Sequence, residues 1–252
     1  MRSRAVAVLA GAVVLAQIAY PLVPVGSARD GLTIATVLLF AVASLAHAAL
    51  TRGPATAGIL LLVAGGLGFL AESVGVATGV PFGHYAYGDT LGPELAGVPL
   101  VIPLAWVMMA WPAFLVGIRL ARGRWARVLV SAAALASWDL FLDPQMVDAG
   151  HWRWFDPSPA LPWVPDVPLT NYAGWAVVAT LLMALLHPSV PAVRSSLDPV
   201  AYGLYLWTYF SSVFAHLAFF GLPGSALWGG LGMGAVALPL VATLRRPAPL
   251  PR

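Results

Sequence analysis

Long apolar runs restrict the possible folds of this sequence more than any other feature. A helix needs about 20 apolar residues to cross the hydrocarbon core of a membrane, and this 252-residue chain is 60% hydrophobic and only 9% charged. The pattern predicts an all-α, polytopic integral membrane bundle of about eight transmembrane helices, forming a single domain over residues 1–252. The expected helices are 5–20, 31–50, 55–78, 98–120, 125–143, 171–187, 199–220 and 226–244.

The arginines predict how the bundle is oriented. All 13 basic residues are Arg, and the cytoplasmic loops of membrane proteins carry an excess of positive charge. If both termini are cytoplasmic, only Arg29 and Arg153 lie outside, which favours this topology in the plasma membrane. The other arginines then lie on the cytoplasmic side: Arg2, Arg4, Arg52, Arg119, Arg122, Arg124, Arg127, Arg194, Arg245, Arg246 and Arg252. The small number of charges gives no indication of nucleic-acid binding.

The N-terminal segment leaves one alternative open. "MRSRAVAVLAGAVVLAQIAYPLVPVGSA" has the basic start, apolar middle and small-residue end of a signal peptide. Cleavage after Ala28 would leave seven helices in the same orientation. The chain has no cysteine, which excludes disulfides, thiolate nucleophiles, iron–sulfur clusters and Cys-ligated zinc.

Two connections, 79–97 and 144–170, are longer than most links between helices. The expected topology puts both on the outer side. Each is rich in Gly, Pro, Tyr, Trp and Asp, a composition that favours ordered turns and aromatic side chains at the interface. Long ordered loops of this kind are usually functional, so we expect them to contribute to a site.

A weak internal repeat follows these loops. "VPLVIPLAW" (98–106) and "VPLTNYAGW" (167–175) share Val-Pro-Leu and a Trp at the same spacing, with Pro in the first turn of a helix. The units 55–121 and 125–188 would be parallel repeats, although so short a match could arise by chance. A true repeat would bring the acids of both units to the same depth.

Acidic residues in the membrane are the strongest indication of function. Asp139 and Asp143 in "ASWDLFLDPQMV" are four residues apart and share a helix face. Each charge at the centre of a membrane helix costs about 2.5–3.5 kcal/mol on insertion scales, so we expect the pair to hold a proton between them and to act as a proton donor. Structural alternatives remain: Asp143 precedes Pro144 and could end the helix at the interface, and Glu72 could simply bond a neighbouring helix.

The histidines do not form the short-spaced clusters that a membrane di-iron enzyme requires, so the sequence predicts no metal site. Most of them are expected to have local partners. His84 lies close to Asp89 and is a candidate for binding or proton handling. The others are His47, His151, His187 and His216.

Three segments resemble one known family. "VPFGHYAYGDTLGPELAGVPLVIPLAW", "ASWDLFLDPQMVDAGHWRW" and "VPLTNYAGW" are similar to the CruF-type carotenoid biosynthesis proteins, the membrane carotenoid 1,2-hydratases that include the bisanhydrobacterioruberin hydratases. The resemblance covers roughly residues 65–220. It implies a hydro-lyase that adds water to the terminal C=C of a linear or ψ-ended carotenoid without a cofactor. "FDPSPALPWVPDVPLTNY" departs from the family pattern in detail, which leaves the choice of carotenoid open.

The resemblance also implies roles for particular residues. Asp139 or Asp143 would be the acid, and Glu72 or Asp89 would position the water. Aromatic faces can stabilise a passing cation, which makes Trp106 and Trp138 candidates for the cavity wall. The remaining substrate-binding candidates are Tyr85, Tyr87, Asn171, Tyr172 and Trp175. The expected partners are a carotenoid, membrane lipid and other enzymes of the carotenoid pathway.

Two other readings compete with hydration. Asp139-x-x-x-Asp143 resembles half of the Mg²⁺-diphosphate site of a membrane prenyltransferase, but that chemistry needs a second Asp-rich motif and several basic groups, and Arg153 is the only nearby base. A transporter or pigment-binding scaffold would use intramembrane acids as an ion path. Against this second reading, the acids gather at one end of the bundle and do not cross the bilayer.

Overall fold

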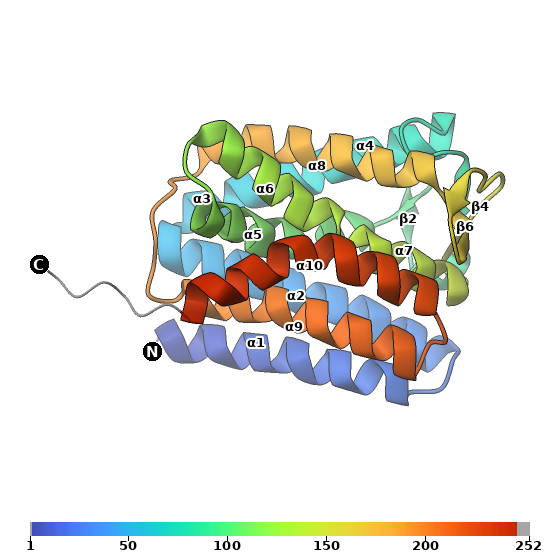
Figure 1. Cartoon of the computed structure of the whole chain (residues 1–252), viewed down its shortest axis with the longest axis horizontal. Helices are drawn as coiled ribbons and strands as arrows, with labels where there is room; N and C mark the ends of the chain where they lie inside the picture. Colours follow the sequence, from blue (N-terminus) through green and yellow to red (C-terminus); the bar gives the residue numbers. More distant parts are fainter. Residues whose placement is uncertain (1, 246–252) are drawn as a thin grey trace, which may run out of the picture.

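A computed structural model describes residues 2–245 of the chain, with side chains from residue 4. In the described part, eight helical rods run side by side and form one bundle (Figure 1). Seven of these rods are long and apolar enough to cross a membrane, and α9 is a further rod of 21 residues beside them. The prediction of an all-α, polytopic membrane bundle is confirmed, and each of the eight expected ranges corresponds to one rod.

The rods follow one another along the chain, with short links at one end and with two long and two short links at the other (Figure 1). Two of them are interrupted: a π-helical turn, η2, joins α3 to α4, and a break at residues 137–138 joins α6 to α7. In order, the helices are α1 (Arg2–Ala19), α2 (Ser27–Arg52), α3 (Pro54–Leu60), η2 (Leu61–Gly65), α4 (Gly66–Thr78), α5 (Ile102–Leu120), α6 (Arg124–Ala136), α7 (Asp139–Asp148), α8 (Leu169–Ser189), α9 (Asp198–Ala218) and α10 (Pro223–Arg245), with the 3₁₀ turns η1 (Tyr20–Leu22) and η3 (Asp89–Leu91).

Helix α5 lies at the centre of the bundle. Most of its residues are buried, among them Trp106, Trp111 and Phe114, and it packs against α2, α6 and α9. The outer faces of the peripheral rods carry large apolar side chains such as Leu62 and Leu231, which are 75% and 61% exposed. An apolar outer surface on helices of this length is that of a protein surrounded by lipid.

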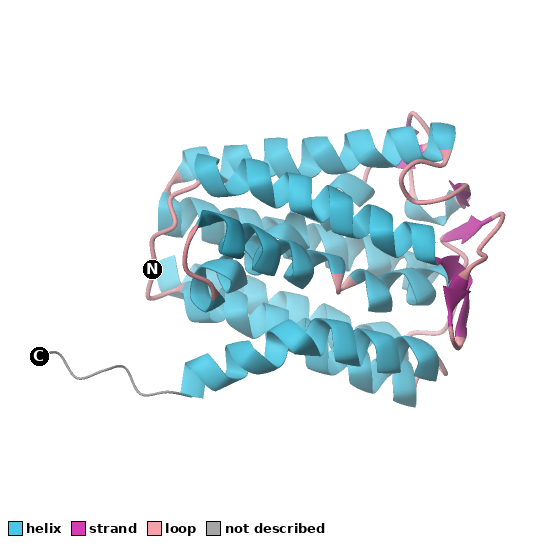
Figure 2. Ribbon diagram, turned by 45° about the horizontal axis from the view of Figure 1, so that its top comes forward, coloured by secondary structure: helices cyan, strands magenta, loops and turns pink. Residues whose placement is uncertain are grey.

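The two long loops form short strands that gather at one end of the bundle (Figure 2). Strand β1 (Tyr85–Tyr87) of the first loop pairs antiparallel with β4 (Trp152–Trp154) of the second. Two further hairpins are β2 (Glu94–Leu95) with β3 (Val98–Pro99) and β5 (Ala160–Leu161) with β6 (Val164–Pro168). Both loops are therefore ordered, as expected, but their pairing with each other was not predicted.

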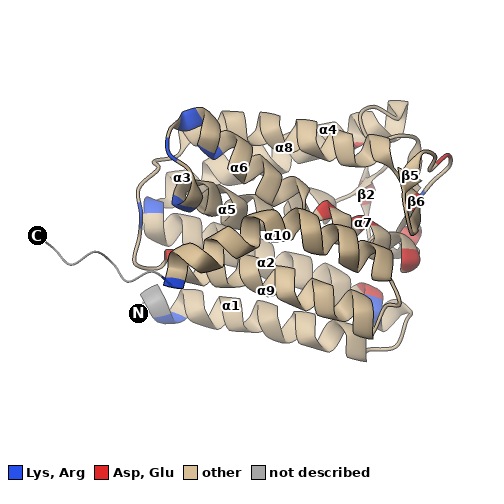
Figure 3. Cartoon of the chain, in the orientation of Figure 1, with Lys and Arg blue, Asp and Glu red and all other residues tan. Residues whose placement is uncertain are grey.

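Opposite charges lie at opposite ends of the bundle. Most arginines are at the end where both ends of the described chain lie, and most acids are at the strand end (Figure 3). This separation agrees with the arrangement expected from the positive-inside rule. Arg246 and Arg252 lie outside the described residues. Which end faces the cytoplasm stays a prediction.

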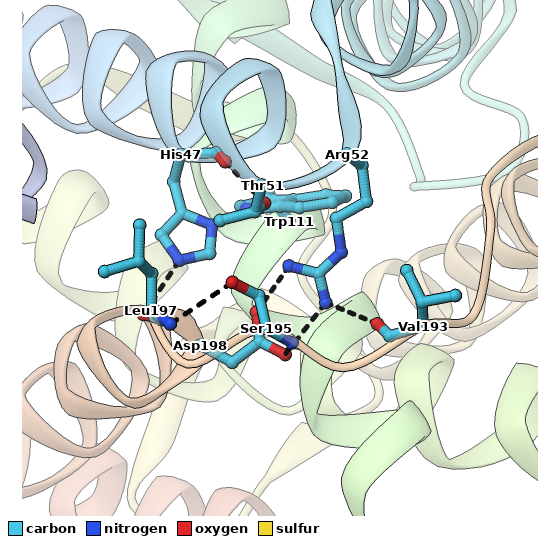
Figure 4. A network of polar contacts seen from close by, with 8 residues as sticks. All are labelled: His47, Thr51, Arg52, Trp111, Val193, Ser195, Leu197 and Asp198. Carbon is cyan, nitrogen blue, oxygen red and sulfur yellow. Dashed lines mark hydrogen bonds and ion pairs between the residues drawn. The ribbon is translucent and has the colours of Figure 1, made fainter. Parts of the chain in front are cut away.

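One acid lies at the arginine end, in a buried network that we call the clamp: Arg52, Asp198, His47 and Trp111 (Figure 4). Arg52 donates to both carboxylate oxygens of Asp198 and, over 2.7 Å, to the carbonyl of Val193. Trp111 Nε1 donates to His47 Nδ1 over 2.9 Å. Since an indole only donates, His47 Nε2 carries the ring proton and donates to the carbonyl of Leu197 over 3.0 Å. The clamp fixes the α8–α9 loop to α2 and α5.

Candidate active site

A cavity of about 60 Å³ lies at the strand end, between α2, α4, α5, α7, α8 and the paired strands β1 and β4. We call it the acid cavity, because Glu72 and Asp143 both line it. Its other walls are mainly aromatic and aliphatic, and they include Asn171. Two carboxyl groups from rods far apart in sequence therefore face one apolar space.

Glu72 on α4 is 5% exposed and accepts hydrogen bonds from three neutral donors. Its Oε2 accepts from the hydroxyls of Tyr85 (2.6 Å) and Tyr87 (2.8 Å), and its Oε1 accepts from Trp106 Nε1 (3.1 Å). A carboxylate oxygen has two acceptor sites. Oε2 is therefore fully used, whereas Oε1 keeps one acceptor site.

Small residues and strand alternation make this arrangement possible. A Cβ at Gly68 would lie 2.6 Å from the ring of Trp106, and a Cβ at Gly75 would lie 2.9 Å from the hydroxyl of Tyr85. Both glycines thus let an aromatic side chain lie directly against α4. Tyr85 and Tyr87 are two residues apart on β1 and so point to the same face. Burial, and secondarily the charge of Glu72, raise the pKa of both phenols well above the ordinary value, so they remain donors.

Asp139 and Asp143 lie one turn apart in α7 and are 0% and 3% exposed. Both converge on a single amide, because Asn171 Nδ2 at the start of α8 donates to Asp139 Oδ2 over 2.8 Å and also to Asp143 Oδ2. Asp143 lines the acid cavity and Asp139 lies behind it. The Oδ1 atom of Asp139 is buried with no partner among the described residues. The ion pair found in the described part of the chain is Arg52–Asp198, so no cation neutralises the acids of the cavity there.

Indole rings form one wall of the acid cavity. Trp106 and Trp175 stack with their ring centroids 4.0 Å apart and an interplanar angle of 14°, and Trp138 meets Trp175 edge-on at 6.1 Å. The π faces of such rings attract a cation within about 6 Å. The wall is therefore suited to a substrate that becomes positively charged.

Most of the candidate residues meet at this cavity. Those that line it are Glu72, Tyr85, Tyr87, Trp106, Trp138, Asp143, Asn171 and Trp175. Asp139 is in contact with the set without lining the space. Tyr172 is half-buried, with its hydroxyl buried and unpartnered among the described residues. Asp89 is exposed on η3 and does not line the cavity. His84 is also exposed and does not line it.

Sequence reasoning missed Trp152 and Trp154, which line the cavity from β4. A signal for them exists: Gly-His-aromatic-x-aromatic occurs at 83–87 and again at 150–154. The two copies are the strands that pair, with Tyr85 opposite Trp154 and Tyr87 opposite Trp152. Both glycines have positive φ, 90° and 77°, a backbone conformation that favours Gly.

In the described part of the chain, no group of three or more His, Asp or Glu side chains is placed to hold a metal ion. His47, His187 and His216 each contact a carbonyl or hydroxyl oxygen, and His151 contacts the hydroxyls of Thr90 and Thr33. His47 and His187 thus have the local polar partners expected of them, and His216 is satisfied by two backbone carbonyls.

Two comparisons with known proteins agree with the resemblance seen in the sequence. The family model described as "Carotenoid biosynthesis protein" matches residues 31–196, which include every acid-cavity residue named above. The bisanhydrobacterioruberin hydratase of Haloarcula japonica is 36% identical over 149 residues, covering 53% of this chain and 49% of that protein. The chain thus spans about half the length of this curated relative. No solved structure matches the chain.

Proposed function

The chain belongs to the carotenoid biosynthesis protein family, and from that premise we propose that it is a membrane hydratase, a hydro-lyase that adds water to the terminal C=C of a linear or ψ-ended carotenoid. The relative from Haloarcula japonica is named for the hydration of bisanhydrobacterioruberin. A carotenoid dissolves in lipid, and the acid cavity lies among rods most of which are long and apolar enough to cross a membrane. The proposed partners are therefore the carotenoid and the membrane.

The observation that carries this proposal is that one aromatic cavity is bordered by two carboxyl sites with different surroundings, the Asp139–Asp143 pair and Glu72. The Asp139–Asp143 pair converges on the amide of Asn171 and has no cation beside it in the described residues. Two adjoining buried carboxyl groups are accommodated best when they share a proton. Glu72 has only donors around it, which suits the ionised form. The Asp139–Asp143 pair can therefore supply a proton, and Glu72 can accept one.

These roles give a complete reaction. Asp143, which faces the cavity, donates a proton to the less substituted alkene carbon, and the π electrons form the new C–H bond. The tertiary cation that results lies against the Trp106–Trp175 wall. Water forms the C–O bond to this cation and passes its proton to Glu72 Oε1, the oxygen with an acceptor site left. Proton return from Glu72 to the Asp139–Asp143 pair restores the site, and no oxidant or reductant is needed.

The alternative of prenyl transfer is less well supported. A diphosphate needs basic groups to hold it, and the nearby Arg153 lies on the exposed face of β4, with its guanidinium 5.3 Å from the ring of Phe155. Magnesium dependence of the activity would favour prenyl transfer over hydration.

Pigment analysis tests the proposal. A host that accumulates the unhydrated ψ-ended carotenoid is grown with and without this chain, and its pigments are separated and weighed by mass spectrometry. We expect a product heavier by one water per reacted end, with a tertiary alcohol. Unchanged pigment in cells that contain the folded protein in their membranes would contradict the proposal.

A further inference from the structure

A second cavity of about 140 Å³ adjoins the acid cavity, between α1, α2, α7 and α9. Six residues line both spaces, so the two cavities are neighbours. Two of the wall residues are methionines, which are flexible and adapt to irregular spaces. The shared residues are Thr33, Val37, Met108, Trp138, Leu142 and Met146.

The lining of the second cavity differs from that of the acid cavity. It is rich in uncharged hydrogen-bonding side chains, and no charged residue lines it among the described residues. Such a lining suits a neutral molecule that both donates and accepts hydrogen bonds. The polar residues are Gln17, Thr33, Thr36, Gln145, Thr208, Ser211 and Ser212.

Two residues that line this cavity each have a buried polar atom with no partner within the described part of the chain: Thr36 Oγ1 and Gln17 Oε1. Other helical hydroxyls here donate to the carbonyl four residues earlier, as Thr33 does to Arg29 (3.1 Å) and Thr208 does to Leu204 (2.9 Å). Thr36 makes no such bond. Buried polar groups in proteins are nearly always hydrogen-bonded, to protein or to water, so these two atoms point to a ligand that forms hydrogen bonds.

We propose that the second cavity is a water chamber, which stores the water that captures the carotenoid cation. The inference rests on the proposed hydratase function and extends it. A water needs a polar site with two to four partners and room for about one probe sphere, and this cavity has both with room for several waters. The acid cavity, by contrast, is walled mostly by rings and aliphatic chains, which favour the cation but hold little water. Water crosses the shared wall beside Thr33 and Trp138 to reach the cation.

The proposal predicts what happens when the chamber loses its polar groups. Protonation of the alkene by Asp143 does not involve the chamber, so the cation still forms. When less water is bound in the chamber, more of the cation loses a proton and returns to the unhydrated alkene. In D₂O the returned alkene carries deuterium. The ratio of deuterated unhydrated carotenoid to hydrated product therefore reports water capture separately from protonation and from folding.

The experiment compares the wild-type chain with Thr36→Val and with the double variant Gln17→Leu/Thr36→Val, in membranes suspended in D₂O with a ψ-ended carotenoid. We expect the ratio to rise about tenfold in the double variant, as for the loss of one or two hydrogen bonds to water. Thr36→Val alone, which keeps the size of the side chain, serves if the double variant does not fold. Thr180→Val is the matched control, because Thr180 is half-buried on α8, its hydroxyl donates to the carbonyl of Ala176, and it lines neither cavity.

The possible results separate the two proposals. A wild-type chain that gives neither hydrated product nor deuterium label overturns the hydratase function itself. A wild-type chain that hydrates, with an unchanged ratio in the folded variants, overturns the water chamber alone. An unchanged ratio with a raised KM only for carotenoids that already bear a hydroxyl group would assign the chamber to that hydroxyl and would likewise overturn the role in water storage.

Discussion

The clamp at one end of the bundle and the acid cavity at the other are both buried, but their carboxyl groups have different hydrogen-bond donors. The donors include a charged guanidinium in the clamp and are all neutral at the acid cavity. Asp198 in the clamp receives a guanidinium on both oxygens and the backbone N–H of Ser195. Glu72, Asp139 and Asp143 receive only phenols, an indole and an amide. Neutral donors satisfy an oxygen without neutralising its charge.

This difference separates a structural acid from a chemical one. A buried ion pair fixes two segments together and keeps its carboxylate ionised, so it has no proton to give. The Asp139–Asp143 pair has no cation beside it among the described residues, so it is accommodated best with a shared proton, and that proton is available for transfer. Glu72 has three neutral donors around it, which suit the ionised form that accepts a proton. Substitutions at the two ends should therefore affect different properties of the protein.

The largest effect is expected for Asp143→Asn. The amide keeps the shape of the side chain but cannot donate the proton, and general acid catalysis of this kind is typically worth 10²–10⁴-fold. We expect the rate of hydrated-carotenoid formation to fall about 10³-fold, with the protein still folded. The matched control is Glu94→Gln, an exposed acid on β2 at the same end, which should leave the rate unchanged. Full activity of the Asp143 variant would remove Asp143 from the mechanism.

Next in size is Arg52→Met at the clamp. Removal of one partner leaves Asp198 buried and unpaired, which should lower the free energy of unfolding by about 3 kcal/mol. The rate per folded molecule should stay the same, because the clamp does not touch either cavity. Arg52→Met/Asp198→Leu should regain most of the stability. Unfolding in mixed micelles measures the free energy of unfolding. A variant that loses rate but keeps its stability would show that the clamp takes part in the reaction, contrary to this account.

Glu72→Gln should reduce the rate about 10²-fold, the lower part of the range for a positioned base. The one oxygen of Gln can still accept from Tyr85 and Tyr87, but its amide nitrogen cannot accept from Trp106 or take a proton from water. Because the cation still forms, this variant should also exchange deuterium into the unhydrated carotenoid. A slow variant with no exchange would place Glu72 in the protonation step instead.

Tyr87→Phe should have the smallest effect, a decrease of about tenfold, because one of three hydrogen bonds to Glu72 is lost. Burial raises the pKa of the Tyr87 phenol, so it stays protonated and the decrease should be the same from about pH 6 to pH 9. A pH–rate profile of both proteins measures this. A decrease that disappears at high pH would show that the phenol of the wild-type protein loses its proton there, contrary to its buried position.

Much of the fold follows from the sequence because apolar length determines which segments can cross a membrane. The ranges 31–50 and 171–187, for example, fall within α2 and α8. The spacing of Asp139 and Asp143 likewise indicated a shared face. The Gly-His-aromatic-x-aromatic pattern would have indicated β1 and β4 as well.

The rest depends on contacts that no local pattern contains. Asp143 lines the cavity and Asp139 does not, although the two lie one turn apart in α7, which begins after a break in the helix. Asp89 is an acidic residue in an aromatic loop and so resembles a site residue in the sequence, but on η3 it is exposed and does not line the cavity. The second cavity combines residues of α1, α2 and α9 such as Gln17 and Ser211, which lie far apart in sequence. The role of Asp89 and the parallel repeat of 55–121 and 125–188 stay predictions.

Infrared difference spectroscopy of the purified protein tests the central claim most directly, because a protonated carboxyl group has its own C=O stretching band, which shifts in D₂O. At neutral pH we predict such a band in the wild-type protein, a change in its frequency or intensity in Asp143→Asn, and no change in Asp198→Asn. A wild-type spectrum with no protonated carboxyl band, or a band that Asp143→Asn leaves unchanged, would contradict the account.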